Sequence, residues 1–262
     1  MNILEEIAFK TEKRVENLKK SVNYNAVKNN ALSLANQTEP FLFEKALKKN
    51  TVAFICEIKK ASPSKGIITE DFPYIDIAKE YERIGADAVS VLTEPYFFKG
   101  EPEYLKQISQ NVKIPILRKD FIIDEIQIYE TKLIGASGML LICSLLDSIQ
   151  LRDFINIADN LGLSCLVEAH TKEETETAVN ANARIIGVNN RNLKTFDVDI
   201  KNSINLRKYV PSDIIYVSES GINSREQIKE LEKNNVNAVL IGETFMKSKN
   251  KADELAFLKG LK

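Results

Sequence analysis

Histidine is almost absent from this chain of 262 residues, in which His170 is the only one. The composition therefore gives little support to a His/Cys metal cluster or a Ser-His-Asp triad. Cysteine is scarce as well: Cys56, Cys143 and Cys165 all lie inside apolar, strand-like runs. That placement indicates buried thiols in a reducing cytoplasm.

A long apolar run and a strong net charge are also missing. No run reaches the roughly 20 residues that a membrane-spanning helix needs. The first residues carry acids early and lack the apolar centre of a signal peptide. The net charge of -1 gives no reason to expect binding to nucleic acid or to an anionic membrane surface. We therefore expect a cytoplasmic protein with no nucleic-acid or membrane partner and no obligate protein partner.

From residue 52 onward, short apolar runs alternate with amphipathic stretches rich in Lys and Glu. Eight runs predict strands: Val52–Ile58, Ala88–Leu92, Pro115–Leu117, Met139–Cys143, Ser164–Val167, Arg184–Val188, Ile214–Val217 and Ala238–Ile241. The stretches between them predict helices, including Ile75–Ile84, Asp124–Ile134, Ser148–Leu161, Thr171–Asn180 and Ser224–Glu232. Runs this apolar are typical of a parallel sheet that is buried on both faces.

Eight strand–helix repeats predict an α/β fold, a (β/α)8 TIM barrel, which closes at roughly 250 residues. An open doubly wound sheet is the competing architecture, but its glycine-rich dinucleotide turn is missing after the first strand. Before the barrel, Ile3 to about Lys20 and Leu42 to Lys48 have helical spacing. We expect residues 1–262 to form a single domain, with residues 1–50 as an N-terminal helical extension that covers the barrel.

Polar and charged residues collect where the expected strands end. Side chains two residues apart on a strand share a face, so Glu57 points with Lys59 and Asn189 with Arg191. The other strand ends carry Thr93 and Glu94, Lys119 and Asp120, Ser144, Glu168, Glu219 and Ser220, and Glu243 and Thr244. One such pair could be an ordinary salt bridge. Three carboxylates, two lysines and an arginine at the catalytic end of a barrel favour chemistry.

The last two strand ends suit an anion. Ser-Glu-Ser-Gly-Ile at 218–222 and Ile-Gly-Glu-Thr at 241–244 place small residues where backbone N–H groups can face a ligand. A single glycine at a strand end is usually just a turn. Loops after the seventh and eighth strands, however, hold phosphate in many barrels, so the two together favour a phosphate site.

Seven segments together carry a family resemblance. They are CEIKKASPSKG (56–66), SVLTEPYFFKG (90–100), LRKDFIID (117–124), LVEAH (166–170), IGVNNRNL (186–193), SESGI (218–222) and IGETFM (241–246). With them the chain resembles indole-3-glycerol phosphate synthase from Ile3 to the final helix. The resemblance implies ring closure, decarboxylation and dehydration of 1-(2-carboxyphenylamino)-1-deoxyribulose 5-phosphate. It also implies that neither a metal nor an organic cofactor is needed.

The resemblance assigns roles to particular residues. The catalytic set it implies is Glu57, Lys59, Lys119, Glu168, Asn189, Glu219 and Ser220. The implied phosphate-binding set is Gly221, Gly242, Glu243 and Thr244, and the implied set for the rest of the substrate is Ser62, Phe98, Phe121, Arg191 and Leu193.

Within these sets, Lys119 is expected to donate a proton to the substrate ketone, because an ammonium can act as a general acid. Glu168 would orient or polarise that step, and Lys59 with Glu57 would supply the acid and base of dehydration. Which lysine serves which step stays open, since Lys59 could also reach the phosphate. Ser62 lies in an expected mobile flap, and Arg191 suits the substrate carboxylate. His170 is treated as a loop residue without an assigned role.

Several alternatives stay open at this point. Lys119 could be a solvated loop lysine beside Asp120, and Arg191 could form a surface salt bridge. The barrel could be a Schiff-base aldolase that uses Lys119 or Lys59, or a sugar-phosphate-binding regulator without turnover. Against the regulator, every expected catalytic position keeps its functional group.

Overall fold

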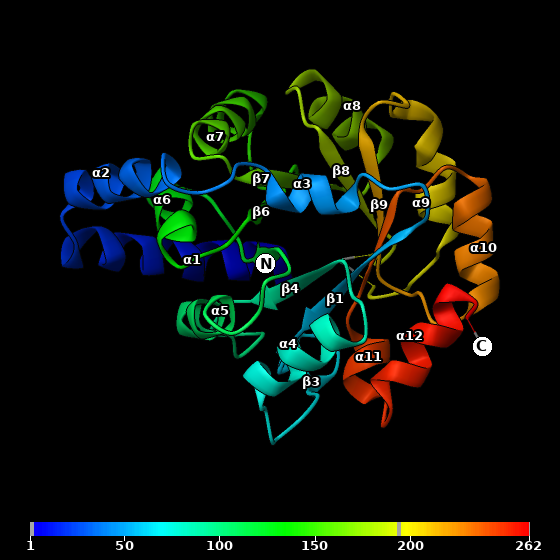
Figure 1. Ribbon diagram of the computed structural model, residues 1–262. Helices are drawn as coiled ribbons and strands as arrows, with labels where there is room; N and C mark the ends of the chain where they lie inside the picture. Colours follow the sequence, from blue (N-terminus) through cyan, green and yellow to red (C-terminus); the bar gives the residue numbers. More distant parts are fainter. Residues whose placement is uncertain (1–2, 193–194, 262) are drawn as a thin grey trace.

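Eight parallel strands close into a barrel in this computed structural model, which describes residues 3–192 and 195–261 (Figure 1). The barrel strands are β1 (Ala53–Ile58), β4 (Ala88–Leu92), β5 (Ile116–Lys119), β6 (Gly138–Ile142), β7 (Ser164–Ala169), β8 (Ile185–Asn189), β9 (Ile215–Glu219) and β10 (Ala238–Ile241). Each pairs with its neighbour in the chain, and β1 pairs with β10 to close the ring. The predicted barrel is therefore confirmed. The third strand is longer than expected, since it continues to Lys119.

Helices cover the outside of the barrel (Figure 1). They are α4 (Tyr74–Arg83), α5 (Pro102–Ser109), α6 (Glu125–Leu133), α7 (Ser148–Asn160), α8 (Lys172–Asn180), α9 (Lys201–Leu206), the 3-10 turn η1 (Arg207–Tyr209), α10 (Arg225–Lys233), α11 (Glu243–Lys247) and α12 (Lys251–Lys259). Helices α5 and α9, with only eight and six residues, are not among the helices expected from the sequence. Helices α6, α7 and α10 begin with capping boxes at Asp124, Asp147 and Ser224. Among the described helices, none is long and apolar enough to cross a bilayer.

Alternate strand residues fill the inside of the barrel. On β1 these are Ala53 and Ile55, and on β9 they are Ile215 and Val217, all of them buried in one inner cluster. The next inward position on β9 is a carboxylate, because side chains on a strand alternate between faces. The apolar layers therefore form the floor on which a polar layer rests at the C-terminal ends of the strands.

The N-terminal extension reaches both ends of the barrel. Its helices are α1 (Ile3–Ser21), α2 (Tyr24–Ala35) and α3 (Leu42–Leu47). Helix α3 closes the N-terminal end, where Phe43 and Leu47 are buried against the inner cluster (Figure 1). Helix α2, which the sequence analysis missed, packs on α6. The start of α1 lies at the opposite end, over the mouth.

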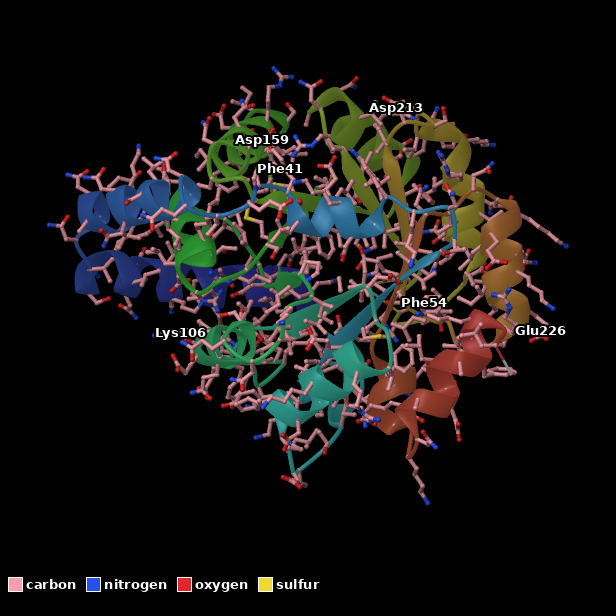
Figure 2. All side chains as sticks on the ribbon, viewed as in Figure 1. Phe41, Phe54, Lys106, Asp159, Asp213 and Glu226 are labelled. Atoms are coloured by element: carbon pink, nitrogen blue, oxygen red, sulfur yellow. The ribbon has the colours of Figure 1, made fainter. Side chains whose placement is uncertain are left out.

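Arg184, the residue before β8, fastens the extension to the barrel. Its guanidinium lies 2.7 Å from Glu44 Oε2 on α3 and 2.7 Å from Asp159 Oδ2 on α7. It also stacks on the ring of Phe41, 4.6 Å from the ring centre. Phe41 and Asp159 are labelled close together in Figure 2. The planar, multivalent guanidinium suits this junction better than a lysine would.

A small antiparallel hairpin, formed by β2 (Ala61–Ser62) and β3 (Gly66–Ile67), follows the first barrel strand. It lies in the Ser-Pro-Ser loop that follows β1, where a mobile flap is expected from the sequence. Gly66 has a φ of 65°, a backbone conformation that glycine adopts without strain.

Candidate active site

A cavity of about 890 Å³ opens at the C-terminal ends of the barrel strands. Its size suits a small organic phosphate. Of the residues implied by the resemblance, it is lined by Glu57, Lys59, Ser62, Phe98, Lys119, Phe121, Glu168, Asn189, Arg191, Glu219, Ser220, Gly221, Gly242, Glu243 and Thr244. The remaining one, Leu193, lies outside the described residues. The structure thus brings the other expected residues together at one mouth.

Lys119 lies at the centre of the polar layer. Its Nζ is 3.0 Å from Glu168 Oε2 and 3.1 Å from Glu219 Oε2. Only 13% of its side chain is exposed. Asp120 points to the other face of the sheet, where it pairs with Arg118 and Arg14. The interpretation of Lys119 as a solvated lysine beside Asp120 is therefore wrong.

The electrostatics of this cluster are set by burial and by an excess of acids. Burial disfavours the Lys119 ammonium, but the carboxylates of Glu168, Glu219 and Glu57 outweigh it and raise the pKa of Lys119. Burial also acts on Glu219. Together with Glu168 and Glu57 it raises the pKa of Glu219 to about 7, despite the contact with Lys119. The cluster therefore holds a charged lysine beside a carboxyl that can carry a proton near neutral pH.

Glu219 is left open toward the cavity. Both of its carboxylate oxygens are buried, and neither forms a hydrogen bond within the described part of the chain. Its charged partner is the Lys119 ammonium, 3.1 Å from Oε2. Gly187 on the neighbouring β8 makes room for it, since a Cβ there would collide with Glu219 Oε1. An unsatisfied buried carboxyl is costly, so its retention points to a ligand.

Glu57 and Lys59 form the expected pair at the end of β1. Lys59 Nζ lies 2.5 Å from Glu57 Oε1, and both side chains are largely buried. Gly242, at the end of β10, faces this pair: a Cβ at Gly242 would collide with the Glu57 carboxylate and lie 3.1 Å from Lys59 Nζ. The loop at Gly242, where phosphate binding is expected, therefore lies close to the Glu57–Lys59 pair, which agrees with the expectation that Lys59 could also reach the phosphate.

Glu168 is held from several sides. Lys119 contacts one of its oxygens, and His170 Nε2 lies 3.5 Å from the other, Oε1. Burial favours the neutral acid, but Lys119, His170 and a hydrogen bond from Asn189 outweigh it and lower the pKa of Glu168. His170 thus lies against the polar layer of the site, although from the sequence it is treated as a loop residue without an assigned role.

The expected phosphate end has an unusual backbone. Ser220 and Gly221 have φ values of 70° and 82°, and a left-handed serine is uncommon. Thr244 donates its hydroxyl to the carbonyl of Ile222, which ties the two loops together. The Glu243 carboxylate points to cations, with Lys247 Nζ at 2.6 Å and Arg191 Nη2 at 3.8 Å. The Glu243 side chain therefore pairs with these two cations, and only the backbone of Glu243 is suited to binding an anion.

The expected aromatic subsite lies on the other side of the cavity. The rings of Phe98 and Phe121 are 6.2 Å apart, a separation typical of packed aromatic pairs. Arg191 reaches the cavity and donates to the carbonyl of Phe196, so its ion pair with Glu243 is only one of its contacts. Ser62 lines the cavity from β2.

Two of the strand-end positions noted in the sequence have structural tasks. Thr93 donates to Asp120 behind the sheet, and Glu94 accepts hydrogen bonds from three successive backbone N–H groups, those of residues 96–98. Glu94 therefore shapes the loop that carries Phe98. Ser144 lines a neighbouring cavity of about 650 Å³ and not this one.

The sequence analysis missed the part of α1 that lines the site. Ile3, Leu4 and Ile7 form one wall of the cavity. Their helical spacing was visible, but spacing alone does not say which surface an apolar face will cover. Lys65, on the turn of the β2–β3 hairpin, also lines the cavity and lies 4.0 Å from Glu243 Oε1.

Solved structures with this architecture include a 3-hexulose-6-phosphate synthase, with a TM-score of 0.66 at 10% identity, covering 80% of this chain and 99% of that one. The tryptophan synthase A-subunit of Pyrococcus furiosus matches with a TM-score of 0.59 at 12% identity, covering 80% and 98% of the two chains. At such low identity these likenesses support the barrel fold alone.

Sequence comparison goes further. The family model for indole-3-glycerol phosphate synthase matches residues 4–258. The synthase of Ruminiclostridium cellulolyticum is 60% identical over 258 residues, which cover 98% of this chain and 99% of the relative. That of Endomicrobium trichonymphae is 55% identical, with the same coverage. A full-length match of this kind, on a barrel whose mouth holds the expected acids and bases, shows that the chain belongs to the indole-3-glycerol phosphate synthase family, the carboxy-lyases of tryptophan biosynthesis.

Proposed function

We propose that the cavity at the barrel mouth performs the family's reaction with the residues described above. The reaction converts 1-(2-carboxyphenylamino)-1-deoxyribulose 5-phosphate into indole-3-glycerol phosphate, carbon dioxide and water. The observation that carries the assignment is the buried Lys119, held between Glu168 and Glu219 in the cavity that also contains the Glu57–Lys59 pair. Perturbed acids and bases that converge in one pocket are typical of catalytic sites.

The substrate would bind with its two ends in opposite parts of the cavity. Its phosphate would accept hydrogen bonds from backbone N–H groups near Gly221 and Gly242, with Ser220, Glu243 and Thr244 shaping those loops. Its benzene ring would pack on Phe98 and Phe121, which line the same cavity. Arg191 would pair with the carboxylate of the substrate, supported by Ser62, and Leu193 would add to the apolar wall. This placement holds the ketone near the centre of the mouth.

Ring closure would use Lys119 as the general acid. The aromatic carbon that bears the carboxylate attacks the ketone carbon, and the ketone oxygen takes a proton from the ammonium. Glu168 would orient Lys119, while Asn189 holds Glu168 in place. Carbon dioxide then leaves from the same aromatic carbon, and its bonding electrons restore the aromatic ring.

Dehydration would use the pair at the end of β1. Lys59 would give a proton to the departing hydroxyl, and Glu57 would remove a proton from the adjacent carbon. Because the two groups are 2.5 Å apart, the proton that Glu57 removes could pass back to Lys59 between turnovers. Because Gly242 lies against both groups, Lys59 could also contact the phosphate. The open carboxyl of Glu219 would hydrogen-bond to a substrate hydroxyl.

These steps use only acids and bases of the chain itself, so we propose that no metal or organic cofactor takes part. We also propose that residues 1–262 act as a single domain without an obligate partner, because the extension forms part of the cavity wall. The cysteines at 56, 143 and 165 are buried and unpaired, which supports a reducing, cytoplasmic setting.

The test is the rise of indole fluorescence when the purified chain meets the anilino-ribulose phosphate. Turnover should persist in the presence of a chelator. Inorganic phosphate should raise the apparent KM and leave kcat unchanged, because it competes for binding that is common to ground and transition states. Absence of product would overturn the assignment, and failure of phosphate to compete would move the anion site elsewhere.

A further inference from the structure

His170, the only histidine of the chain, is clamped between two carboxylates. Its Nε2 lies 3.5 Å from Glu168 Oε1, and its Nδ1 lies 3.4 Å from Glu174 Oε2 on α8. The same Glu174 oxygen accepts the backbone N–H of His170 at 2.6 Å. The backbone carbonyl of His170 accepts from Asn202 on α9. The ring is thus fixed in place, with one acid at each nitrogen.

A carboxylate faces each ring nitrogen, so the surrounding negative charge favours the protonated imidazole. Burial acts against that charge, but Glu174, Glu168 and Glu219 outweigh it and raise the pKa of His170. Nε2 is buried and forms no hydrogen bond in the described structure, so its interaction with Glu168 is electrostatic. Arg191, Asp197 and Asp199 are charged residues that line the same neighbouring cavity as His170.

We propose that His170 is a positioning residue which, when protonated, shares the negative charge of Glu168 with Lys119 and so makes Lys119 a stronger acid for ring closure. The inference rests on the proposed function, in which Lys119 is the acid. Three carboxylates raise the pKa of Lys119. A proton held too tightly is donated slowly. A second cation on the far oxygen of Glu168 offsets part of that pull.

The sign of the pH dependence follows from this arrangement. Below the pKa of His170, the imidazolium is present and Lys119 is the stronger acid, so the histidine contributes its full rate advantage. As the pH rises through that pKa, the advantage disappears. Glu219, with a pKa of about 7, titrates in the same range. The informative quantity is therefore the ratio of kcat between the parent and a variant without the imidazole, because titrations common to both cancel.

The kinetic experiment compares His170→Gln and Glu174→Gln with the parent from about pH 5 to about pH 9, a range that brackets an imidazole. For His170→Gln, the kcat ratio should be about three- to tenfold at low pH, since one pKa unit of the acid is at most tenfold in rate. It should fall toward one at high pH. Glu174→Gln keeps an oxygen for the backbone N–H of His170 but removes the charge. The fall in its kcat with rising pH should therefore begin at a lower pH than in the parent.

The second readout does not depend on turnover. In a preparation without a histidine tag, the chain gives a single imidazole NMR signal. Its pKa should lie above the ordinary value in the parent and fall in both Glu174→Gln and Glu168→Gln. Lys172→Gln is the matched control. It removes a positive charge two residues from His170 in the sequence, and the Lys172 side chain is 47% exposed. It should change neither the imidazole pKa nor the pH profile.

Two outcomes would overturn the inference. The first is an imidazole pKa at or below its ordinary value. The second is a raised imidazole pKa with a kcat ratio for His170→Gln that stays constant with pH, as a merely structural role would give. In either case the proposed function would stand, because the role of Lys119 is tested separately by its own variant.

Discussion

Two neighbouring residues of β5, Arg118 and Lys119, place buried cations on opposite faces of the same sheet. Arg118 faces the helices, is 1% exposed, and contacts Asp120 at 3.1 Å and Glu130 at 2.7 Å. It also donates to Thr131 and to backbone, so its planar fork is satisfied. Lys119 faces the cavity with two carboxylates, one of which, Glu219, forms no hydrogen bond within the described residues.

The difference separates a structural network from the one that we propose to be catalytic. Behind the sheet, Arg118 has several fixed partners, and Asp120 is also tied to Arg14 of α1, whose Nη1 is the one buried atom of these three side chains that forms no hydrogen bond among the described residues. Burial favours neutral Asp120, but the two arginines outweigh it and lower its pKa. On the cavity side of the sheet, Lys119 of the same strand lies among carboxylates, and the set of hydrogen-bond partners among the described residues is incomplete at Glu219. A saturated network fixes a conformation, whereas an open one leaves donors and acceptors for a substrate.

The largest expected effect comes from breaking the open network. Lys119→Met should lower kcat by about 10²–10⁴-fold, the usual contribution of a general acid, while leaving the fold intact. Glu219 can take up a proton once the lysine is gone, so little uncompensated charge remains. Steady-state kinetics and far-UV circular dichroism would measure both effects. Near-normal turnover would show that Lys119 is not the acid.

Arg118→Met, at the residue before Lys119, should give the reverse pattern, in which the main loss is in stability. It leaves Asp120 and Glu130 facing an apolar side chain, and removal of one partner from a buried ion pair costs about 3–5 kcal/mol. Urea unfolding should show this loss, together with a much smaller loss for Lys119→Met. Equal destabilisation by the two variants would contradict the distinction between the two faces.

Glu219→Gln should change how stability depends on pH. The pKa of Glu219 is raised to about 7, so the native state binds its proton more tightly than the unfolded chain does. Its stabilising contribution is complete below the unfolded pKa and is lost as the pH rises to about 7. The variant lacks this loss, so relative to the parent it should gain about 1–3 kcal/mol across that interval. A stability difference that does not vary with pH would contradict the raised pKa.

The smallest effect should come from Gly242→Ala, which connects the phosphate loop to catalysis. The added methyl group would push the Glu57 carboxylate away from Lys59. We expect kcat to fall about tenfold, because the Glu57 carboxylate would move only a short distance from its position beside Lys59. Gly100→Ala would not serve as a control, because its Cβ would collide with the backbone of Leu92. Gly66→Ala is not a neutral control either, because a φ of 65° strains any residue with a side chain, although no atom lies within 4 Å of a Cβ there. Gly242→Ala is therefore compared directly with the parent. A Gly242→Ala effect confined to KM would limit this residue to phosphate binding.

Much of this arrangement could be predicted from the sequence, because it depends on local periodicity. The two-residue repeat of a strand places Glu57 with Lys59 on the inside, and the number of repeats predicts the barrel. The polar layer that we propose to be catalytic occupies the next inward position above the apolar residues. Short helices such as α5 and α9 were missed, since six to eight residues give too little periodic signal.

The rest depends on contacts between distant segments. Arg14 meets Asp120 across 106 residues of sequence, and nothing near either residue indicates the other. Likewise, Gly187 looks like a weak strand residue until β9 places Glu219 beside it. His170 was set aside because the sequence placed it beyond a strand, and only the packing of α8 shows the carboxylate on its other side.

The most direct test of the two-site chemistry is a rapid-quench experiment that follows carbon dioxide release and indole formation in the same reaction. The central claim is that Lys119 acts before decarboxylation and Glu57 after it. Lys119→Met should therefore slow both products equally. Glu57→Gln should release carbon dioxide promptly while indole lags, because a decarboxylated, still-hydrated intermediate accumulates. Equal slowing of both products in Glu57→Gln, or prompt carbon dioxide release in Lys119→Met, would contradict the account.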